Sequence, residues 1–316
     1  MPGPDRLRLI FLGTPEIAVP SLTALAAAGH QVRLVVTQPD RPAGRGRKLQ
    51  RGAVAAAADA LSLPVAQPAR AAEIMAQIAG LAPDALAVVA FGQVLPPALL
   101  ALPRLGAVNL HTSLLPALRG AAPIQRAIMT GLAETGVSTM FMDAGLDTGD
   151  IILQRATPIG PQETAGELGQ RLGQIGAELL ARTMAVLARG DAPRRPQDPA
   201  LASLAPRLRK EEGRVDWSRP AREIDWLVRG ADPWPGAFTL WRGQPLKLFA
   251  PTRLEDVPAD APPGSLLPSP PEAGFLRLAT GQGVLGLGQV QAPGKRRLPA
   301  ADFLRGTRLE PGEKMG

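Results

Sequence analysis

The sequence predicts an α/β protein: an N-terminal doubly wound, mostly parallel sheet followed by a smaller C-terminal antiparallel β-barrel. Two observations carry this prediction. Strand-like and helix-like runs alternate through the first half of the chain, and short strand-like runs separated by glycine and proline fill the last third. With 316 residues, the chain is long enough for two domains of ordinary size.

The first half contains four apolar runs that we expect to be buried strands, at residues 6–13, 31–38, 84–92 and 105–111. We expect helices at 19–29 and 52–64; the first has Pro20 near its start and Gly29 at its end. Apolar strands that alternate with helices are typical of a parallel sheet covered on both faces. Ligands of such sheets bind at the carboxyl ends of the strands, where Gly13, Phe91 and the stretch 109–111 fall.

The clearest helix covers residues 163–190. Its apolar residues follow a spacing of three to four, and Thr164 with Glu167 fits a capping box. A charged, Pro-rich stretch follows and is typical of a linker. We therefore expect a catalytic domain at 1–189, a linker at 190–206 and a barrel domain at 207–316, with strands near 245–254, 275–281 and 283–294.

Composition narrows the possible functions. Hydrophobic residues make up 45% and charged residues 20%, and no apolar stretch reaches the roughly 18 residues that cross a bilayer. The N-terminus lacks the apolar core of a signal peptide, so we expect a cytoplasmic protein. The absence of cysteine excludes disulfides and thiolate sites, and two histidines argue against a zinc centre. The net charge of +7 with 3% aromatic residues indicates that an RNA partner would be held mainly through phosphates.

Three polar residues are candidates for chemistry. Asn109 and His111 lie two apart at the end of a strand, so their side chains share a face, and Asp147 lies in a glycine-interrupted loop. Residues 113–123 form a long non-periodic stretch that is typical of a binding loop. These groups suit acyl transfer without a covalent intermediate, because amide and imidazolium groups can stabilise an oxyanion and a carboxylate-coupled histidine can relay a proton. The structural alternative is that Asn109 caps a turn and Asp147 pairs with a surface arginine.

Two stretches, NLHTSLLPALRGAAPIQRAI at 109–128 and TGVSTMFMDAGLDTGDII at 135–152, resemble the formyltetrahydrofolate-dependent transferase family. That family carries an N-x-H-x-S-L-L-P segment and a downstream L-D-T-G-D aspartate. The resemblance runs nearly end to end and includes FLGTPEIAVPSL, TQPDRPAGRGRKL, AFGQVLP, EEGRVDWS and ADPWPGAF. The basic loop together with the second domain resembles, within this family, the methionyl-tRNA formyltransferases.

The resemblance implies a Rossmann-like formyltransferase fold with an OB-like C-terminal barrel. It implies a catalytic trio of Asn109, His111 and Asp147, a 10-formyltetrahydrofolate donor, and the α-amino group of methionyl initiator tRNA as acceptor, without a metal. The residues that match or adjoin the family's folate-binding segments are Ser113, Leu114, Leu115, Pro116, Phe91, Gly92, Val94 and Leu95.

Basic residues are the candidates for contact with tRNA. In the loop after the second strand they are Arg41, Arg45, Arg47 and Lys48, and the resemblance implies that Arg45 lies against the acceptor stem. In the second domain they are Arg242, Lys247, Lys295, Arg296 and Arg297. A solvated surface loop has the same composition, and this is the structural alternative. We expect the protein to act as a monomer.

Three other functions stay open at this point. The nearest is formyl transfer from the same donor to a small-molecule amine, on a ribotide or a sugar nucleotide. An RNA-binding module without catalysis is the second. A dehydrogenase is the third, and it is disfavoured because G-x-G-x-x-G is absent and only Gly13 is in place, so we expect no NAD.

Overall fold

The computed structural model describes residues 6–43, 48–254, 261–269, 274–307 and 312–316. The chain divides into two compact units. Unit 1 contains Met1–Pro123, Thr135–Thr157 and Gly169–Ala205, and unit 2 contains Ile124–Glu134, Pro158–Leu168 and Pro206–Gly316. This division differs from the expected boundaries in two ways: segments 124–134 and 158–168 group with the C-terminal part, and most of the expected linker groups with unit 1.

Unit 1 is built on a seven-stranded sheet of order β5-β2-β1-β6-β7-β8-β9. Its strands are β1 Arg8–Gly13, β2 Gln31–Val36, β5 Val65–Ala66, β6 Ala85–Val89, β7 Ala107–His111, β8 Glu134–Phe141 and β9 Ile151–Pro158. The pairs from β5 to β7 are parallel, and β8 runs antiparallel to β7. The predicted mostly parallel α/β sheet is therefore confirmed.

Both faces of this sheet are covered. On one face Ile10 and Leu86 pack with Ile78 from a helix, and on the other Leu9 and Phe11 are fully buried. The helices that follow strands of this sheet along the chain are α1 Val19–Ala27, α2 Ala53–Ala60, α3 Met75–Gly80, α4 Pro97–Leu100, α5 Pro123–Met129 and α6 Ala165–Arg189. Nearly all of α5 and the start of α6 group with unit 2. Short 3-10 helices are η1 Glu16–Ala18, η2 Ala71–Ile74 and η3 Pro199–Leu201.

The start of α6 confirms the predicted capping box. The Glu167 amide donates to Thr164 Oγ1 at 3.3 Å, and the Thr164 amide donates back to Glu167 Oε2 at 2.9 Å. These bonds satisfy backbone donors that a helix start leaves free.

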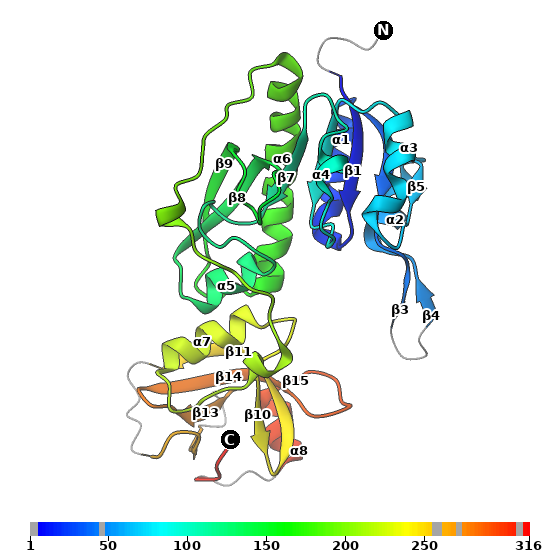
Figure 1. Cartoon of the computed structure of the whole chain (residues 1–316). Helices are drawn as coiled ribbons and strands as arrows, with labels where there is room; N and C mark the ends of the chain where they lie inside the picture. Colours follow the sequence, from blue (N-terminus) through cyan, green and yellow to red (C-terminus); the bar gives the residue numbers. More distant parts are fainter. Residues whose placement is uncertain (1–5, 44–47, 255–260, 270–273, 308–311) are drawn as a thin grey trace. The chain divides into compact units, whose positions relative to one another are not determined.

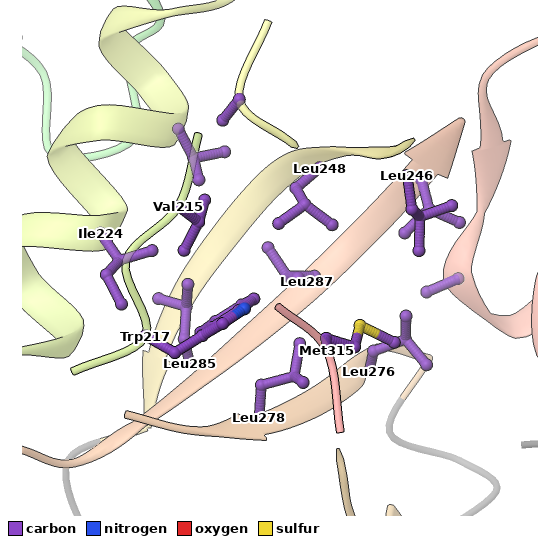
Figure 2. Close-up of a cluster of buried hydrophobic side chains, with 14 of the residues drawn as sticks. Val215, Trp217, Ile224, Leu246, Leu248, Leu276, Leu278, Leu285, Leu287 and Met315 are labelled. Carbon is purple, nitrogen blue, oxygen red and sulfur yellow. The ribbon is translucent and has the colours of Figure 1, made fainter. Parts of the chain in front are cut away.

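Unit 2 is built on an antiparallel half-barrel sheet of order β10-β11-β14-β13-β12, with β15 paired to β14. Its strands are β10 Phe238–Trp241, β11 Gln244–Leu254, β12 Leu266–Leu267, β13 Leu276–Ala279, β14 Val284–Gln291 and β15 Leu298–Pro299, and its other elements are η4 Lys210–Gly213, α7 Ala221–Gly230 and α8 Ala300–Gly306. Figure 2 shows its core, where Ile224 of α7 and Trp217 meet leucines of the strands. Trp217 Nε1 donates to Thr239 Oγ1 at 3.0 Å, which satisfies the buried indole.

Among the described residues no helix is both long enough and apolar enough to cross a membrane.

Acidification should destabilise unit 1 through His30. This side chain is 8% exposed, its Nδ1 accepts from the Leu7 amide at 3.2 Å, and burial lowers its pKa below the usual value near 6.5. A lowered histidine pKa means that the unfolded chain binds the proton more readily. Stability is therefore present above pH 6.5 and is lost as the pH falls through the folded pKa. The loss is at most about 1.4 kcal/mol per pH unit.

Urea unfolding of the wild type and of His30→Asn across pH 7.5 to 5 measures this effect. We expect the wild type to lose more stability than the variant over this range. Parallel curves for the two proteins would contradict a titrating His30.

Candidate active site and basic surfaces

Strand β7 carries two of the three candidate catalytic side chains to the edge where parallel strands end. Asn109 pairs with Val88 of β6 and Met140 of β8, and His111 pairs with Ser138 of β8. Since side chains alternate along a strand, Asn109 and His111 point to the same face. His111 is 6% exposed and Asn109 is half-buried, so the amide is the more accessible of the two.

The imidazole of His111 lies between two hydrogen-bond acceptors. Its Nε2 is 2.9 Å from the carbonyl oxygen of Leu118, and its Nδ1 is 3.7 Å from Asp147 Oδ2. Because a carbonyl only accepts, Nε2 carries the hydrogen in this arrangement. Only the imidazolium can donate toward both neighbours. The structure thus brings His111 and Asp147 together from segments 36 positions apart in the chain.

The Asp147 carboxylate is aimed at this histidine by its loop. Asp147 has a φ of 54°, and its Oδ2 also accepts from the Gly120 amide at 2.8 Å. Gly149 lies two residues on and must be glycine, because a Cβ there would be 1.8 Å from the Phe141 carbonyl oxygen. A positive φ at a non-glycine residue is a strained arrangement that its surroundings must maintain.

Sequence reasoning missed the residues that maintain it. Gln197 Nε2 donates to the carbonyl oxygens of Asp147 at 2.9 Å and Gly149 at 2.7 Å. Arg119 donates to Gln197 Oε1 through Nε at 3.1 Å and Nη2 at 2.7 Å. Gln197 lies in the stretch expected to be a linker. The one signal in the sequence is that Gln197 is an uncharged hydrogen-bonding residue in the run 191–200, which otherwise consists of proline, alanine and charged residues.

The candidate folate residues divide into buried and accessible groups. Ser113 is fully buried, with its Oγ donating to the Ala117 carbonyl at 2.6 Å. The side chains of Leu115, Phe91 and Leu95 are also buried, whereas Val94 is 93% exposed. The remaining candidates are Leu114 and Pro116, which are half-buried, and Gly92, which has a φ of 79°. These segments can therefore offer a ligand mainly their backbone and the Val94 side chain.

The expected basic loop is in part a two-stranded ribbon, β3 Arg41–Ala43 and β4 Lys48–Gln50, which projects from unit 1 (Figure 1). Arg45 and Arg47 lie outside the described residues. Arg41 Nη2 donates to Gln38 Oε1 at 2.6 Å. Beside the ribbon, hydrogen bonds from the Gln67 amide and the Gly52 backbone hold the pKa of Asp40 below its usual range.

The basic candidates of unit 2 differ in their hydrogen-bond and ion-pair partners. Arg297 Nη2 is 2.8 Å from Asp232 Oδ1, and its guanidinium lies 3.4 Å from the centre of the Phe249 ring. Arg242 bonds Glu313 at 2.9 Å, and Lys247 Nζ donates to the Pro235 carbonyl at 3.3 Å. Lys295 and Arg296 are exposed.

Within the described part of the chain, no group of three or more His, Cys, Asp or Glu side chains is arranged to hold a metal ion. The expectation of metal-free chemistry stays a prediction.

Comparisons with known proteins point to one family. The model of the formyl transferase family matches residues 7–184, and that of the formyl transferase C-terminal domain matches residues 207–308. The chain is 49% identical over 312 residues to the methionyl-tRNA formyltransferase of Solibacter usitatus, covering 98% of this chain and 99% of the relative. The methionyl-tRNA formyltransferase of Moorella thermoacetica is 48% identical with the same coverage.

Solved structures share the fold at lower identity. The sugar 3N-formyl transferase WlaRD superposes with a TM-score of 0.67 at 16% identity, covering 92% of this chain and 99% of that one. HypX from Aquifex aeolicus, in complex with tetrahydrofolic acid, superposes with a TM-score of 0.66 at 18% identity, covering 95% of this chain and 47% of that one.

Proposed function

Since this chain belongs to the formyl transferase family, and within it to the methionyl-tRNA formyltransferases, we propose that it transfers a formyl group from 10-formyltetrahydrofolate to the α-amino group of methionyl initiator tRNA. The product would be N-formylmethionyl-tRNA for translation initiation. The observation that carries the proposal is the likeness over 312 residues at 49% identity, which includes the second unit as well as the first. We propose that the protein acts as a monomer in the cytoplasm.

We assign the chemistry to Asn109, His111 and Asp147. The neutral amine attacks the formyl carbon, a C–N bond forms, and the formyl oxygen becomes an oxyanion that needs hydrogen-bond donors. The Asn109 amide and the Nε2–H of His111 supply them. That N–H donates to Leu118 in the structure, so in the proposed reaction the oxyanion takes the place of the Leu118 carbonyl.

Two of these groups, His111 and Asp147, also handle the proton that must leave the amine. The attacking amine loses a proton to the pair of His111 and Asp147, whose atoms lie 3.7 Å apart. The bond between the formyl carbon and N10 of the folate breaks, N10 takes up the proton that the pair received from the amine, and tetrahydrofolate leaves. An α-amino group titrates near pH 8, so a useful neutral fraction exists without metal activation.

We propose that the basic residues of both units contact tRNA phosphates. The set is Arg41, Arg45, Arg47 and Lys48 in unit 1 and Arg242, Lys247, Lys295, Arg296 and Arg297 in unit 2. Exposed cations are the better candidates, because a guanidinium already bonded to a carboxylate releases less free energy on meeting a phosphate.

Replacement of Lys295, Arg296 and Arg297 by alanine should weaken the salt dependence of tRNA binding. Each phosphate contact contributes roughly 0.7 to 0.9 to the slope of log K against log salt. Most of the change should come from Lys295 and Arg296, since Arg297 bonds Asp232 at 2.8 Å. Filter binding from 50 to 300 mM salt gives the slope. A triple variant with the wild-type slope would assign these residues to ordinary surface.

The test of the proposal is the substrate. The purified chain is mixed with 10-formyltetrahydrofolate and one of three acceptors: methionyl initiator tRNA, glycinamide ribonucleotide or an amino-sugar nucleotide. We expect N-formylmethionine from the tRNA and no product from the small molecules. Transfer only to a small molecule would support the alternative reaction. Tight tRNA binding without any transfer would support an RNA-binding module.

A further inference from the structure

The segment that the sequence presents as a linker contacts the loops that hold the candidate catalytic pair. Arg195 exchanges backbone hydrogen bonds with Ile151, at 2.9 and 3.1 Å. Ten residues on, the Ala205 amide donates to the Arg119 carbonyl at 2.7 Å, and its carbonyl accepts from Ala122 at 3.1 Å. We call residues 195–205 the strap. All of these residues belong to unit 1.

The strap holds the loop that carries the hydrogen-bond partner of His111. Ser203 Oγ accepts from the Leu118 amide at 2.9 Å, and the Ser203 carbonyl accepts from the Arg119 amide at 2.8 Å. Leu118 is the residue whose carbonyl accepts from His111 Nε2. Gly120 follows with a φ of 124°, and a Cβ there would be 2.7 Å from the Ala205 carbonyl oxygen. The strap and this loop therefore approach too closely for any other residue.

The same strap holds the loop of Asp147 through one side chain. The side-chain amide of Gln197 donates to the carbonyl oxygens of Asp147 and Gly149, and its oxygen accepts from Arg119. Arg119 lies in the loop between Leu118 and Gly120, so Gln197 joins the two loops. Both N–H groups of the Gln197 amide thus bind backbone carbonyls at or near the strained Asp147, whose φ is 54°. A strained conformation persists only where its surroundings fix it.

We propose that Gln197 is a positioning residue, which sets the Asp147 carboxylate against His111 by fixing the backbone of residues 147–149. This inference rests on the proposed role of Asp147 and adds a residue outside the trio. Displacement of a catalytic group by about 1 Å can cost about a hundredfold in rate. The effect should fall on turnover, since Gln197 bonds backbone carbonyls and a side chain of unit 1.

Gln197→Leu tests the proposal, because leucine keeps the approximate volume and removes all of these bonds. We expect kcat for formylation of methionyl initiator tRNA to fall 10- to 100-fold, with KM for both substrates within about twofold. Asp198→Ala is the matched control: it lies next in the strap, and its Oδ1 accepts from the nearby Ala200 amide at 2.9 Å rather than from either loop of the site. Its turnover should stay within about twofold of wild type.

A double-mutant cycle with Asp147→Asn separates positioning from a general structural effect. If Gln197 acts through Asp147, Gln197→Leu should add less than about threefold in the Asp147→Asn background. Equal losses in both backgrounds would overturn the proposal, as would unchanged kcat in Gln197→Leu. Wild-type turnover in Asp147→Asn would instead refute the catalytic assignment on which this proposal rests.

Gln197→Glu provides a second variant if Gln197→Leu does not fold, as judged by its melting temperature. Glutamate keeps an acceptor for Arg119 and lacks the hydrogens that Asp147 and Gly149 accept. We expect it to lose turnover as the leucine variant does. A folded Gln197→Glu protein with full kcat would show that these two donors are not needed.

Discussion

Asp147→Asn is expected to lower formyl-transfer turnover by about 10²- to 10⁴-fold while leaving affinity for tRNA within about twofold. Asparagine keeps the shape of the side chain and removes the charge that faces His111 Nδ1 at 3.7 Å. The same oxygen, Oδ2, accepts from the Gly120 amide at 2.8 Å, so the backbone would draw the asparagine oxygen to this place. That oxygen carries no full negative charge, and the imidazole would lack the carboxylate that orients it and stabilises its charged form. Steady-state kinetics with methionyl initiator tRNA measures the loss.

Asp150→Asn is the matched control for this prediction. Asp150 belongs to the same glycine-containing loop, but its carboxylate lies 3.5 Å from Arg194 and bonds neither His111 nor Gly120 in the structure. Turnover of Asp150→Asn should be close to that of the wild type. A loss in tRNA affinity that equals the loss in turnover of Asp147→Asn would contradict its catalytic role.

Arg229→Leu should destabilise unit 2 by about 3–5 kcal/mol. The side chains of Arg229 and Asp225 are 7% and 6% exposed, and the guanidinium donates twice to Asp225 Oδ2, at 3.0 Å each. Arg229 also donates to the Glu163 carbonyl at 3.0 Å. Burial raises the pKa of Asp225 despite the opposing effect of Arg229. Removal of the arginine leaves a buried carboxyl without its cationic partner and takes a donor from the part-buried Glu163 carbonyl.

Urea unfolding measures this cost, and two further variants identify its cause. Arg219→Leu breaks an exposed pair with Glu223 at the start of α7 and should cost less than about 1 kcal/mol. Asp225→Leu combined with Arg229→Leu should recover part of the loss, because an apolar pair leaves no uncompensated charge. A loss below about 1 kcal/mol in Arg229→Leu alone would contradict the stabilising role of this pair.

The sequence predicts the framework of unit 1 because its signals are local. The apolar runs of β1, β2, β6 and β7 and the stripe of α6 depend on neighbours within one element, and the structure confirms them. The same spacing rule places Asn109 and His111 on one face of a strand. The pairing of His111 with Asp147 follows from the resemblance to a family and from no local pattern, since it depends on how two distant segments meet.

The strap could not be predicted for a related reason. Its contacts are hydrogen bonds to backbone carbonyls from Gln197 and Ser203, and such bonds leave no periodicity in the sequence. A stretch rich in proline and charge can be a linker, but it can equally be an extended segment that pairs with a loop, so the composition does not distinguish the two. The grouping of residues 124–134 and 158–168 with unit 2 also has no signal in the sequence, because an apolar residue does not indicate which of two cores it will join.

The most direct test of the account is the single-turnover rate of the chemical step in His111→Ala. Enzyme bound to methionyl initiator tRNA is mixed with saturating 10-formyltetrahydrofolate and quenched from milliseconds to minutes. We predict that the wild type forms N-formylmethionyl-tRNA at least 100-fold faster than the variant, with equal tRNA bound at the start. Formation of the product at the wild-type rate by folded His111→Ala would contradict the account.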